Sequence, residues 1–493
     1  MLKFEGIDLF AGAGGVTTGI EQAKFEGYKI ARIVAAINHD YNAIESHWKN
    51  HPHVKHFVED IKTFDVNKLP EIISDDFTRT FIWASLECTN FSNAKGGLPR
   101  VADSRTLADH LPRYIEKVNP DYILIENVRE FMSWGPLDKN GKPVSKDKGK
   151  DYIRWIKLIK SFGYEYEYKI LNAADFGAYT SRRRLFIIFS KAGMPIAWPE
   201  ATHNKNGANG LLKWKPVKEV LNLNNKGQSI FERHIPLSEN TLRRIYTGCI
   251  KYIALGDTSF LAQYNSGSDN HRVISENNPA NTITTSNRFS LIQPEFIINY
   301  NHSSKCNSID DASPTLLTHD KLGLIKCQFL DQQYGQSNPI TIDRPIGTLT
   351  ANPKFNLVTV NQWIMDTQYN NVGRSIEEPS PVITANRKNH YLITTESGEL
   401  VIKINQDDSE YTKLLKRFMA AYGIIDIYMR MLTIDELKLI TGFDYDYYLE
   451  GTQSERKKFI GNAVPPVLPQ KIFEALYIEN LKMNKGLEIR RAI

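Results

Sequence analysis

The chain has 493 residues, of which 41% are hydrophobic and 24% are charged. This balance is typical of a soluble globular protein of two to four domains, and it excludes collagen, a coiled coil and wholesale disorder. The formal net charge is only +5, so any contact with nucleic acid has to come from a local basic patch.

The cysteines and the apolar runs indicate the compartment. Cys88, Cys249, Cys306 and Cys327 include no C-x-x-C pair, which indicates neither a zinc site nor a disulfide framework. The first residues lack the apolar core of a secretory signal, and no run approaches the roughly 18 apolar residues of a membrane span. We therefore expect a cytoplasmic protein with no membrane contact and no metal.

Up to about residue 200, short apolar runs alternate with helical stretches, as parallel strands joined by crossover helices do. The expected strands are Ile7–Phe10, Ala31–Ile37, Phe81–Ser85, Tyr122–Ile125 and Leu185–Phe189. A helix over Ser104–Lys117 separates the third from the fourth, so we expect these two strands to be parallel and adjacent. The prediction is a doubly wound α/β sheet that binds its ligands beyond the carboxyl ends of the strands.

A polar stretch after residue 200 indicates a second domain over residues 201–424. It contains a degenerate repeat marked by tyrosines at intervals of 36, 34 and 35 residues, namely Tyr264, Tyr300, Tyr334 and Tyr369. Each segment passes through a turn rich in Asn, Asp and Pro and ends in a Thr-rich strand and an aliphatic pair. We expect about four hairpin-like units, and an ordinary β meander is an equally open alternative.

Helical periodicity returns in residues 425–493, with candidate helices over Thr433–Ile440 and Pro466–Leu481. A short helical segment cannot easily form a core alone. We therefore expect it to pack back on residues 1–200, which makes residues 201–424 an insertion.

A glycine-rich turn, Asp8 to Gly15, follows the first strand and precedes a helix. Glycines at such a turn let a ligand approach the backbone closely. Alone the signal is weak, because such turns also serve flavins, nicotinamides or tight packing.

Two chemically active residues follow the strands that we expect to be adjacent. Cys88 lies three residues after Ser85, where a thiol is either a nucleophile or a small buried hydrophobe. Glu126 follows Tyr122–Ile125 directly and is either a functional acid or a helix cap. Their shared edge of the sheet favours a common site.

Two further motifs are ambiguous by themselves. Arg182, Arg183 and Arg184 precede the fifth strand, where they would either bind an anion or remain solvated. The segment Gly461 to Pro466 indicates the start of the last helix.

Together, the order and spacing of these motifs resemble the DNA cytosine-5 methyltransferases of bacteria and phages, over about residues 5–200 and 428–470. The resemblance implies a Rossmann-like, S-adenosylmethionine-dependent methyltransferase domain with an inserted target recognition domain. It implies that the cofactor is bound by Phe10, Gly12, Gly14, Asp40, Asp60 and Asn462. It implies that the catalytic residues are Cys88, Glu126, Arg184 and Arg182.

Two positions depart from the pattern of that family. Asn38 stands where an acidic residue usually binds the cofactor ribose, so Asp40 is a candidate substitute. Leu86 replaces a proline before the nucleophile, and this loss would loosen the loop without removing the chemistry.

The resemblance implies covalent catalysis on a cytosine flipped out of double-stranded DNA. Cys88 would add to C6, Glu126 would bind N3, and Arg184 would lie near O2. The insertion would read the DNA sequence, with contacts to phosphates or bases from Arg288, Lys321, Lys354 and Arg387; these are equally well surface residues beside turns. We expect a monomer.

Two alternatives remain open. A related enzyme would use a modified S-adenosylmethionine or act on RNA, and Asn38 and Leu86 leave room for it. A protein of another class would keep the scaffold as a catalytically inactive DNA-binding protein, but the presence of both Cys88 and Glu126 argues against that function.

Overall fold

The computed structural model describes residues 3–74, 79–86, 107–136, 149–222, 225, 228–250, 404–422, 426–430 and 432–492, together with short strands between 260 and 392. The chain divides into two compact units, one of Met1–Lys213 with Lys438–Ile493 and the other of Trp214–Leu437. The first unit therefore contains both ends of the chain, and the second is inserted in it. No helix among the described residues is long and apolar enough to cross a membrane.

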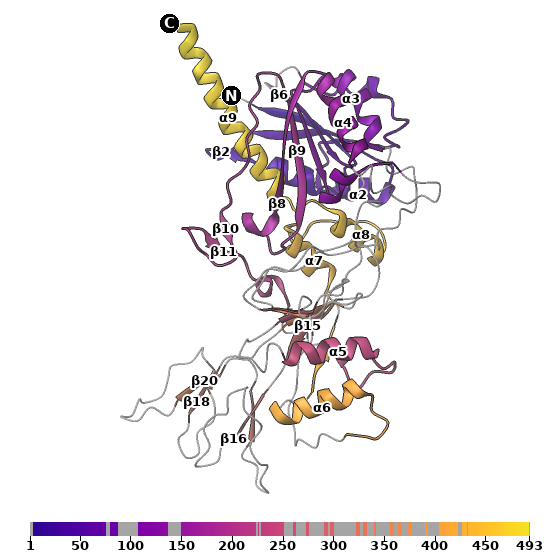
Figure 1. Ribbon diagram of the computed structural model, residues 1–493, viewed down its shortest axis with the longest axis vertical. Helices are drawn as coiled ribbons and strands as arrows, with labels where there is room; N and C mark the ends of the chain where they lie inside the picture. The colour runs from indigo at the N-terminus through magenta and orange to yellow at the C-terminus, as the bar shows by residue number, and fades with distance from the viewer. Residues whose placement is uncertain are drawn as a thin grey trace. The chain divides into compact units, whose positions relative to one another are not determined.

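The first unit is built on a seven-stranded sheet in the order β5-β4-β1-β6-β7-β9-β8 (Figure 1). The strands are β1 (Phe4–Leu9), β4 (Ala31–Asn38), β5 (Lys55–Val58), β6 (Arg79–Ser85), β7 (Tyr122–Asn127), β8 (Tyr164–Asn172) and β9 (Arg183–Lys191). The first five are parallel to one another. This is a doubly wound, Rossmann-like α/β sheet, as the sequence predicts.

The predicted adjacency of two strands is confirmed, because β6 and β7 pair in parallel with Ser85 opposite Glu126. The expectation that Leu185–Phe189 joins the parallel set is wrong. This run lies in β9, which is antiparallel to both β7 and β8. The chain enters β9 from β8 through a short connection, and such a connection can join only antiparallel neighbours.

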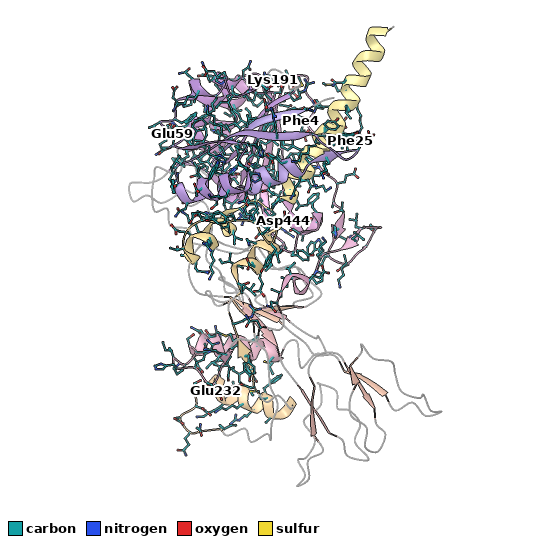
Figure 2. All side chains as sticks on the ribbon, turned by 180° about the vertical axis from the view of Figure 1, so that it is seen from behind. Phe4, Phe25, Glu59, Lys191, Glu232 and Asp444 are labelled. Carbon is teal, nitrogen blue, oxygen red and sulfur yellow. The ribbon has the colours of Figure 1, made fainter. Side chains whose placement is uncertain are left out.

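The helices that connect strands of the sheet are α1 (Gly15–Gln22), α2 (Tyr41–Asn50), α3 (Leu111–Val118) and α4 (Lys150–Ser161). The helices α8 (Gln453–Asn462) and α9 (Val467–Ala492) follow its last strand, and β2 (Lys24–Phe25) and β3 (Tyr28–Lys29) form a small hairpin. The predicted helix over Ser104–Lys117 is a 3-10 turn at Leu107–His110 followed by α3, and its first residues lie outside the described part of the chain. Figure 2 shows the described side chains around the sheet, with Glu59 and Lys191 at the periphery of this unit.

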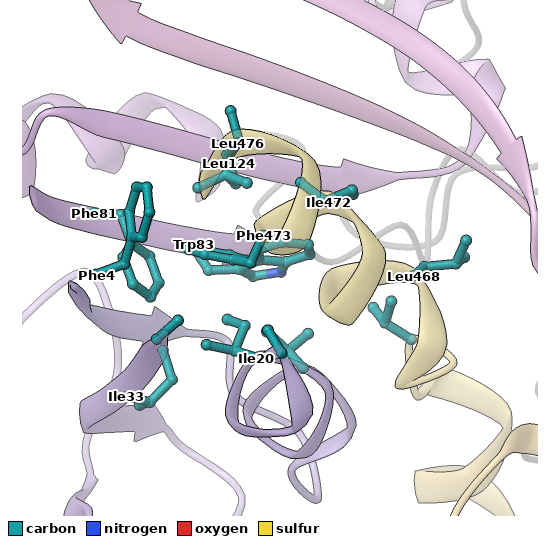
Figure 3. Close-up of a cluster of buried hydrophobic side chains, with 14 of the residues drawn as sticks. Phe4, Ile20, Ile33, Phe81, Trp83, Leu124, Leu468, Ile472, Phe473 and Leu476 are labelled. Atoms are coloured by element: carbon teal, nitrogen blue, oxygen red, sulfur yellow. The ribbon is translucent and has the colours of Figure 1, made fainter. Parts of the chain in front are cut away.

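The C-terminal helix α9 completes one of two hydrophobic cores. Figure 3 shows the side chains of Phe4, Phe81 and Trp83 from the sheet together with Ile472 and Phe473 of α9. The other core lies against α3 and α4 and includes the buried Trp155. Because both faces of the sheet are covered, its central strands are continuous apolar runs, and this is why the sequence reveals them.

The second unit contains α5 (Glu239–Gly248), α6 (Glu410–Tyr422) and short strands whose backbone pairing alone is described between residues 260 and 392. Four strands begin with an aromatic residue at intervals of 36, 33 and 34 residues: β13 (Phe260–Ala262), β16 (Phe296–Asn299), β18 (Phe329–Gln332) and β21 (Trp363–Asp366). Four others include aliphatic residues that close the predicted repeats: β15 (Ser290–Gln293), β17 (Leu322–Ile325), β20 (Phe355–Val358) and β23 (His390–Leu392). For the last repeat this holds for Leu392 alone, since Ile393 lies outside the described residues. The repeated tyrosines lie outside the described residues.

The four strand pairs do not all pair alike. The two inner pairs are separate and antiparallel, β16 with β17 and β18 with β20, in the same register, with Phe296 opposite Ile325 and Phe329 opposite Val358. β18 also pairs with the short β19 (Ile340–Thr341), which lies between β18 and β20 in the chain. In the outer pairs, β21 is antiparallel both to its own partner β23 and to β15, and it is parallel to β13. Each inner pair thus lies in a small sheet of its own, whereas the strands of the two outer pairs are joined in one larger sheet.

The two units divide at residues 213 and 437, whereas the sequence indicates boundaries at 200 and 424. The polar stretch after residue 200 belongs to the first unit, because the amide of Thr202 donates to the carbonyl of Asp175 and β10 (His203–Asn204) packs beside that turn. At the other end, Arg430 donates to both carboxylate oxygens of Glu436 at 2.9 and 2.7 Å and to the carbonyl of Asn222 at 2.8 Å. This network ties together the two ends of the second unit.

Candidate active site

The glycine-rich turn between β1 and α1 leaves open space beside the backbone. Phe10 has a φ of 60° and Gly14 a φ of 102°, both in the left-handed region. A Cβ atom on Gly14 would collide with the Tyr447 hydroxyl, whereas a Cβ atom on Gly12 would meet no atom within 4 Å. Gly14 is therefore required by conformation and packing, and Gly12 borders room for a ligand.

The turn lies at the point where the order of the sheet reverses. The chain passes from β1 to β4 on one side, and then returns to β6 on the other side of β1. Ligands of doubly wound folds bind beyond the carboxyl ends of the strands at this switch point. Leu86, which follows β6, and Glu126, in β7, lie at the same edge of the sheet.

A buried acid and a buried cation form an ion pair at this edge. The Nε atom of Arg184 lies 3.2 Å from Oε1 of Glu126, and both side chains are less than a tenth exposed. Burial raises the pKa of Glu126, and the charges of Arg184 and Arg182 offset part of this rise. The pair thus combines a carboxyl group that readily retains a proton with a fixed positive charge.

The segment that leads to Cys88 is anchored beside this pair. The side-chain amide of Asn127 donates to the carbonyl of Leu86 at 3.2 Å, and its oxygen accepts from the amide of Val128 at 2.7 Å. Leu86 is buried in the core against α3 and α4. Leu86 is therefore held by packing although it lacks the rigidity of proline. Cys88 itself lies outside the described residues.

Arg182 contacts the C-terminal segment. Its guanidinium donates to the carbonyl of Gly461 at 2.9 Å and to that of Asn462 at 3.4 Å, at the end of α8. The sequence groups Arg182 with Arg184 as catalytic; Arg184 is paired with Glu126, and the charge of Arg182 also acts on that carboxyl group. The structure thus brings Asn462 to the strand ends through Arg182.

The two acidic candidates for the cofactor site take part in local structure. Asp40 caps α2 by accepting from the amide of Ala43 at 3.2 Å, and its other oxygen is paired with Lys458 at 3.0 Å. The side chain of Asn38 accepts from the amide of Asp40. Asp60 is exposed and accepts from the amide of Lys62 at 2.9 Å. Their roles toward a cofactor remain predictions.

Sequence reasoning missed a chain of buried polar side chains behind the glycine-rich turn. Asp8 is 1% exposed, accepts from the hydroxyl of Thr17, and is connected through it to His47 and His56. Two signals in the sequence point to single members of this chain: Asp8 lies between the apolar residues Ile7 and Leu9 of β1, and His47 lies one helical turn before His51. The described residues include no group of three or more His, Cys, Asp or Glu side chains placed to hold a metal ion.

Curated relatives match part of the chain. The Type II methyltransferase M.XorII of Xanthomonas oryzae pv. oryzae is 31% identical over 205 residues, which are 40% of this chain and 43% of that protein. M.Sau3AI of Staphylococcus aureus, also a Type II methyltransferase, is 28% identical over 195 residues, which are 38% and 43% of the two chains. The match thus spans less than half the length of each relative.

Solved structures and a family model match more of the chain. A DNMT2 mutant from Spodoptera frugiperda aligns with 96% of this chain and 100% of its own, with a TM-score of 0.48 and 13% identity. The model of the C-5 cytosine-specific DNA methylases matches residues 4–477. Because this match runs from β1 into α9 and includes every motif described above, the chain belongs to the family of C-5 cytosine-specific DNA methylases.

Proposed function

We propose that this protein transfers a methyl group from S-adenosylmethionine to C5 of a cytosine that is flipped out of double-stranded DNA. The observation that carries the proposal is the buried pair of Glu126 and Arg184, at the strand end beside the anchored segment that leads to Cys88. Family membership supports the same reaction.

The glycine-rich turn has the features that such a cofactor needs. Gly12 borders open space, and Oδ1 of Asp8 is buried without a hydrogen-bond partner. A buried carboxylate oxygen of this kind suits a positively charged ligand. We propose that Phe10, Gly12, Gly14 and Asn462 hold the cofactor, which supplies an electrophilic methyl group when it is bound.

The residues beyond β6 and β7 would activate the base. Cytosine C5 is too weak a nucleophile to react directly, so the Cys88 thiolate adds to C6 and forms a carbon–sulfur bond. Glu126 donates a proton to N3, which accepts the electron density that leaves the C5–C6 double bond. Arg184 orients Glu126 and places a positive charge near O2. C5 would then take the methyl group and leave the cofactor as a neutral thioether. Release of the C5 proton to solvent and return of the N3 proton to Glu126 would expel Cys88 as a thiolate and restore the ring.

Access to the base requires the DNA to open. Flipping costs a few kcal/mol of unstacking, which contacts outside the active site must offset. We propose that the second unit serves as the target recognition domain and provides these contacts. Arg288, Lys321, Lys354 and Arg387 are the candidates for phosphate or base contacts, and all four lie outside the described residues.

The test compares cells that express the wild type with cells that express Cys88→Ser. Bisulfite sequencing of their DNA should show modified cytosines only for the wild type. Cys249→Ser is the matched control, because it makes the same chemical change at a buried cysteine of the second unit, and it should leave the pattern intact. Equal patterns for Cys88→Ser and the wild type would overturn the role of Cys88.

The product distinguishes the proposal from its alternatives. Mass spectrometry of digested DNA and RNA should find 5-methylcytosine in DNA; another modified nucleoside, or modification of RNA alone, would favour the related enzyme. A covalent adduct with DNA that contains 5-fluorocytosine would exclude a protein that only binds DNA.

A further inference from the structure

Four buried or half-buried side chains form a continuous hydrogen-bonded chain behind the glycine-rich turn. The hydroxyl of Thr17 in α1 lies 3.1 Å from Oδ2 of Asp8 in β1 and 2.9 Å from Nε2 of His47 in α2. Nδ1 of His47 lies 2.7 Å from Nε2 of His56 in β5. The chain thus connects a carboxyl group beside the turn to a half-buried histidine.

The donors in this chain determine one another. A threonine hydroxyl has one hydrogen, and a neutral histidine has one N–H. When Asp8 is a carboxylate it accepts from Thr17, which then accepts from Nε2 of His47, and Nδ1 of His47 accepts from His56. The other carboxylate oxygen, Oδ1 of Asp8, is buried and has no hydrogen-bond partner among the described residues. The arrangement thus holds Oδ2 of Asp8 and leaves Oδ1 unpartnered.

Other titratable groups surround this chain. Glu21 of α1 is paired with His53 at 2.5 Å and lies 3.5 Å from His51. Nε2 of His51 lies 3.0 Å from the hydroxyl of Thr18, and Tyr447 donates to the carbonyl of Ala13 at 2.7 Å. Among the described residues no cation is paired with Asp8, so the charge of this carboxyl group is not neutralised within the fold.

The charge of Asp8 changes close to neutral pH. Burial raises the pKa of Asp8 to about 8, although the hydrogen bond from Thr17 opposes this rise. Burial also lowers the pKa of His47 well below its usual value and that of His56 to about 4, and the nearby histidines add to both effects. Both histidines are therefore neutral when Asp8 loses its proton.

We propose that Asp8 binds the cationic part of the cofactor through Oδ1, and that Thr17 and His47 are positioning residues that set its charge and thereby make cofactor affinity depend on pH. The inference rests on the proposed use of S-adenosylmethionine, which carries a sulfonium and an ammonium group. When the cofactor binds below pH 8, the Asp8 carboxyl group releases its proton to solvent and remains as the carboxylate. Above that pH no proton has to leave.

The experiment measures S-adenosylmethionine binding to the full chain by calorimetry from pH 6 to pH 9.5. For the wild type we expect affinity to rise by up to about tenfold per pH unit from pH 6 to about pH 7.5, since one proton is released. Above about pH 8 the ammonium group of the cofactor itself loses its proton, so the range below that pH is decisive. Repeating the titration in buffers with different ionisation enthalpies counts this proton. Asp8→Asn should bind weakly at every pH and release none.

Two matched pairs of variants test the positioning residues. Thr17→Val removes the donor to Asp8 and should raise the pH midpoint by about one unit, and Thr17→Ser should restore it. His47→Leu removes the donor to Thr17 and should shift the midpoint less, whereas His47→Gln keeps an amide donor. Thr18→Val is the control, because it removes a comparable bond to His51 and should leave the midpoint unchanged.

The failures of the two proposals are distinguishable. If the wild type binds S-adenosylmethionine at no pH, the proposed function is overturned. If it binds with an affinity independent of pH, or if both Thr17→Val and His47→Leu keep the wild-type midpoint, the inference is overturned while the proposed function stands. Should Thr17→Val not fold, the His47 pair and the proton count decide the inference.

Discussion

The two units support their strands in different ways. In the first, β1 is buried along its whole length and is paired on both sides, with β4 and with β6. In the second, β16 and β17 form a two-stranded sheet of four residues each, and isolated two-stranded hairpins have little stability of their own. The comparison indicates that the strands of the proposed active site are fixed by neighbours on both sides, whereas the proposed recognition surface is built from small units.

The largest effect should follow from Glu126→Gln, because Glu126 lies near the end of β7, which is paired with a strand on each side. Loss of the proton donor should lower the methylation rate about 100- to 10,000-fold while cofactor affinity is kept. Single-turnover kinetics and calorimetry measure the two quantities. Glu116→Gln, on the exposed face of α3, is the control. A loss below tenfold would show that this strand end does not carry the chemistry.

Arg182→Met tests how the first unit holds its two chain segments together. It removes charge-assisted bonds to the carbonyls of Gly461 and Asn462, and the loss should reduce stability by about 2–3 kcal/mol. Chemical denaturation measures the change. The neighbouring Arg183 is exposed, so Arg183→Met should have little effect. If the two variants are equally stable, the bonds of Arg182 do not join the segments.

Two glycine variants in the first unit distinguish a glycine that the backbone conformation requires from a glycine that borders space for a ligand. Gly14→Ala forces a Cβ atom into the left-handed region and against Tyr447, which should cost about 1–3 kcal/mol of stability. Gly12→Ala has open space for its methyl group, so stability should be unchanged while cofactor affinity falls. Thermal unfolding and calorimetry check both. Unchanged affinity in Gly12→Ala would place the cofactor elsewhere.

The smallest effect on the first unit should follow from a change in the second. Deletion of residues 296–328 removes one inner hairpin, that of β16 and β17. In the shortened chain, β18 follows β15 at the same distance in sequence at which β16 follows it now. Cofactor affinity should stay within experimental error, and the methylated DNA sequence should change. A loss of cofactor binding would show that the inner hairpins are not independent of the first unit.

The central strands of the first unit could be predicted because burial on both faces makes them apolar runs. The edge strand β8 could not, because it reads Tyr164-Glu165-Tyr166-Glu167-Tyr168 and most of it is half-buried or exposed. Without β8, the direction of β9 was also unpredictable. A hairpin partner determines the direction of a strand, and apolar content carries no information about it.

The candidate site was predictable only in part. The strand pattern alone could not predict the proximity of Glu126 and Arg184, because a parallel strand would place the arginines that precede it at the opposite edge of the sheet. Only the antiparallel direction of β9 brings its start to the carboxyl end of β7. The chain from Asp8 to His56 joins four elements, and no local pattern encodes contacts between residues so far apart in sequence. The unit boundaries were misjudged because the polar residues after 200 pack against Asp175 by hydrogen bonds, which hydrophobic patterning does not detect.

The place of α9 in the core has a consequence for protein synthesis. The ring of Phe473 lies 5.6 Å from that of Phe4 and 4.6 Å from that of Phe81. The hydrophobic core around the first strands is therefore completed only by residues that are synthesised almost last. On the ribosome, one face of the sheet, which α1 covers in part, remains incompletely covered until the whole second unit has been translated. The glycine-rich turn, in which Gly15 lies close to the carbonyl of Val464, is completed at the same moment. A cell would therefore not contain a completely folded first unit before the second unit of the same chain has been made.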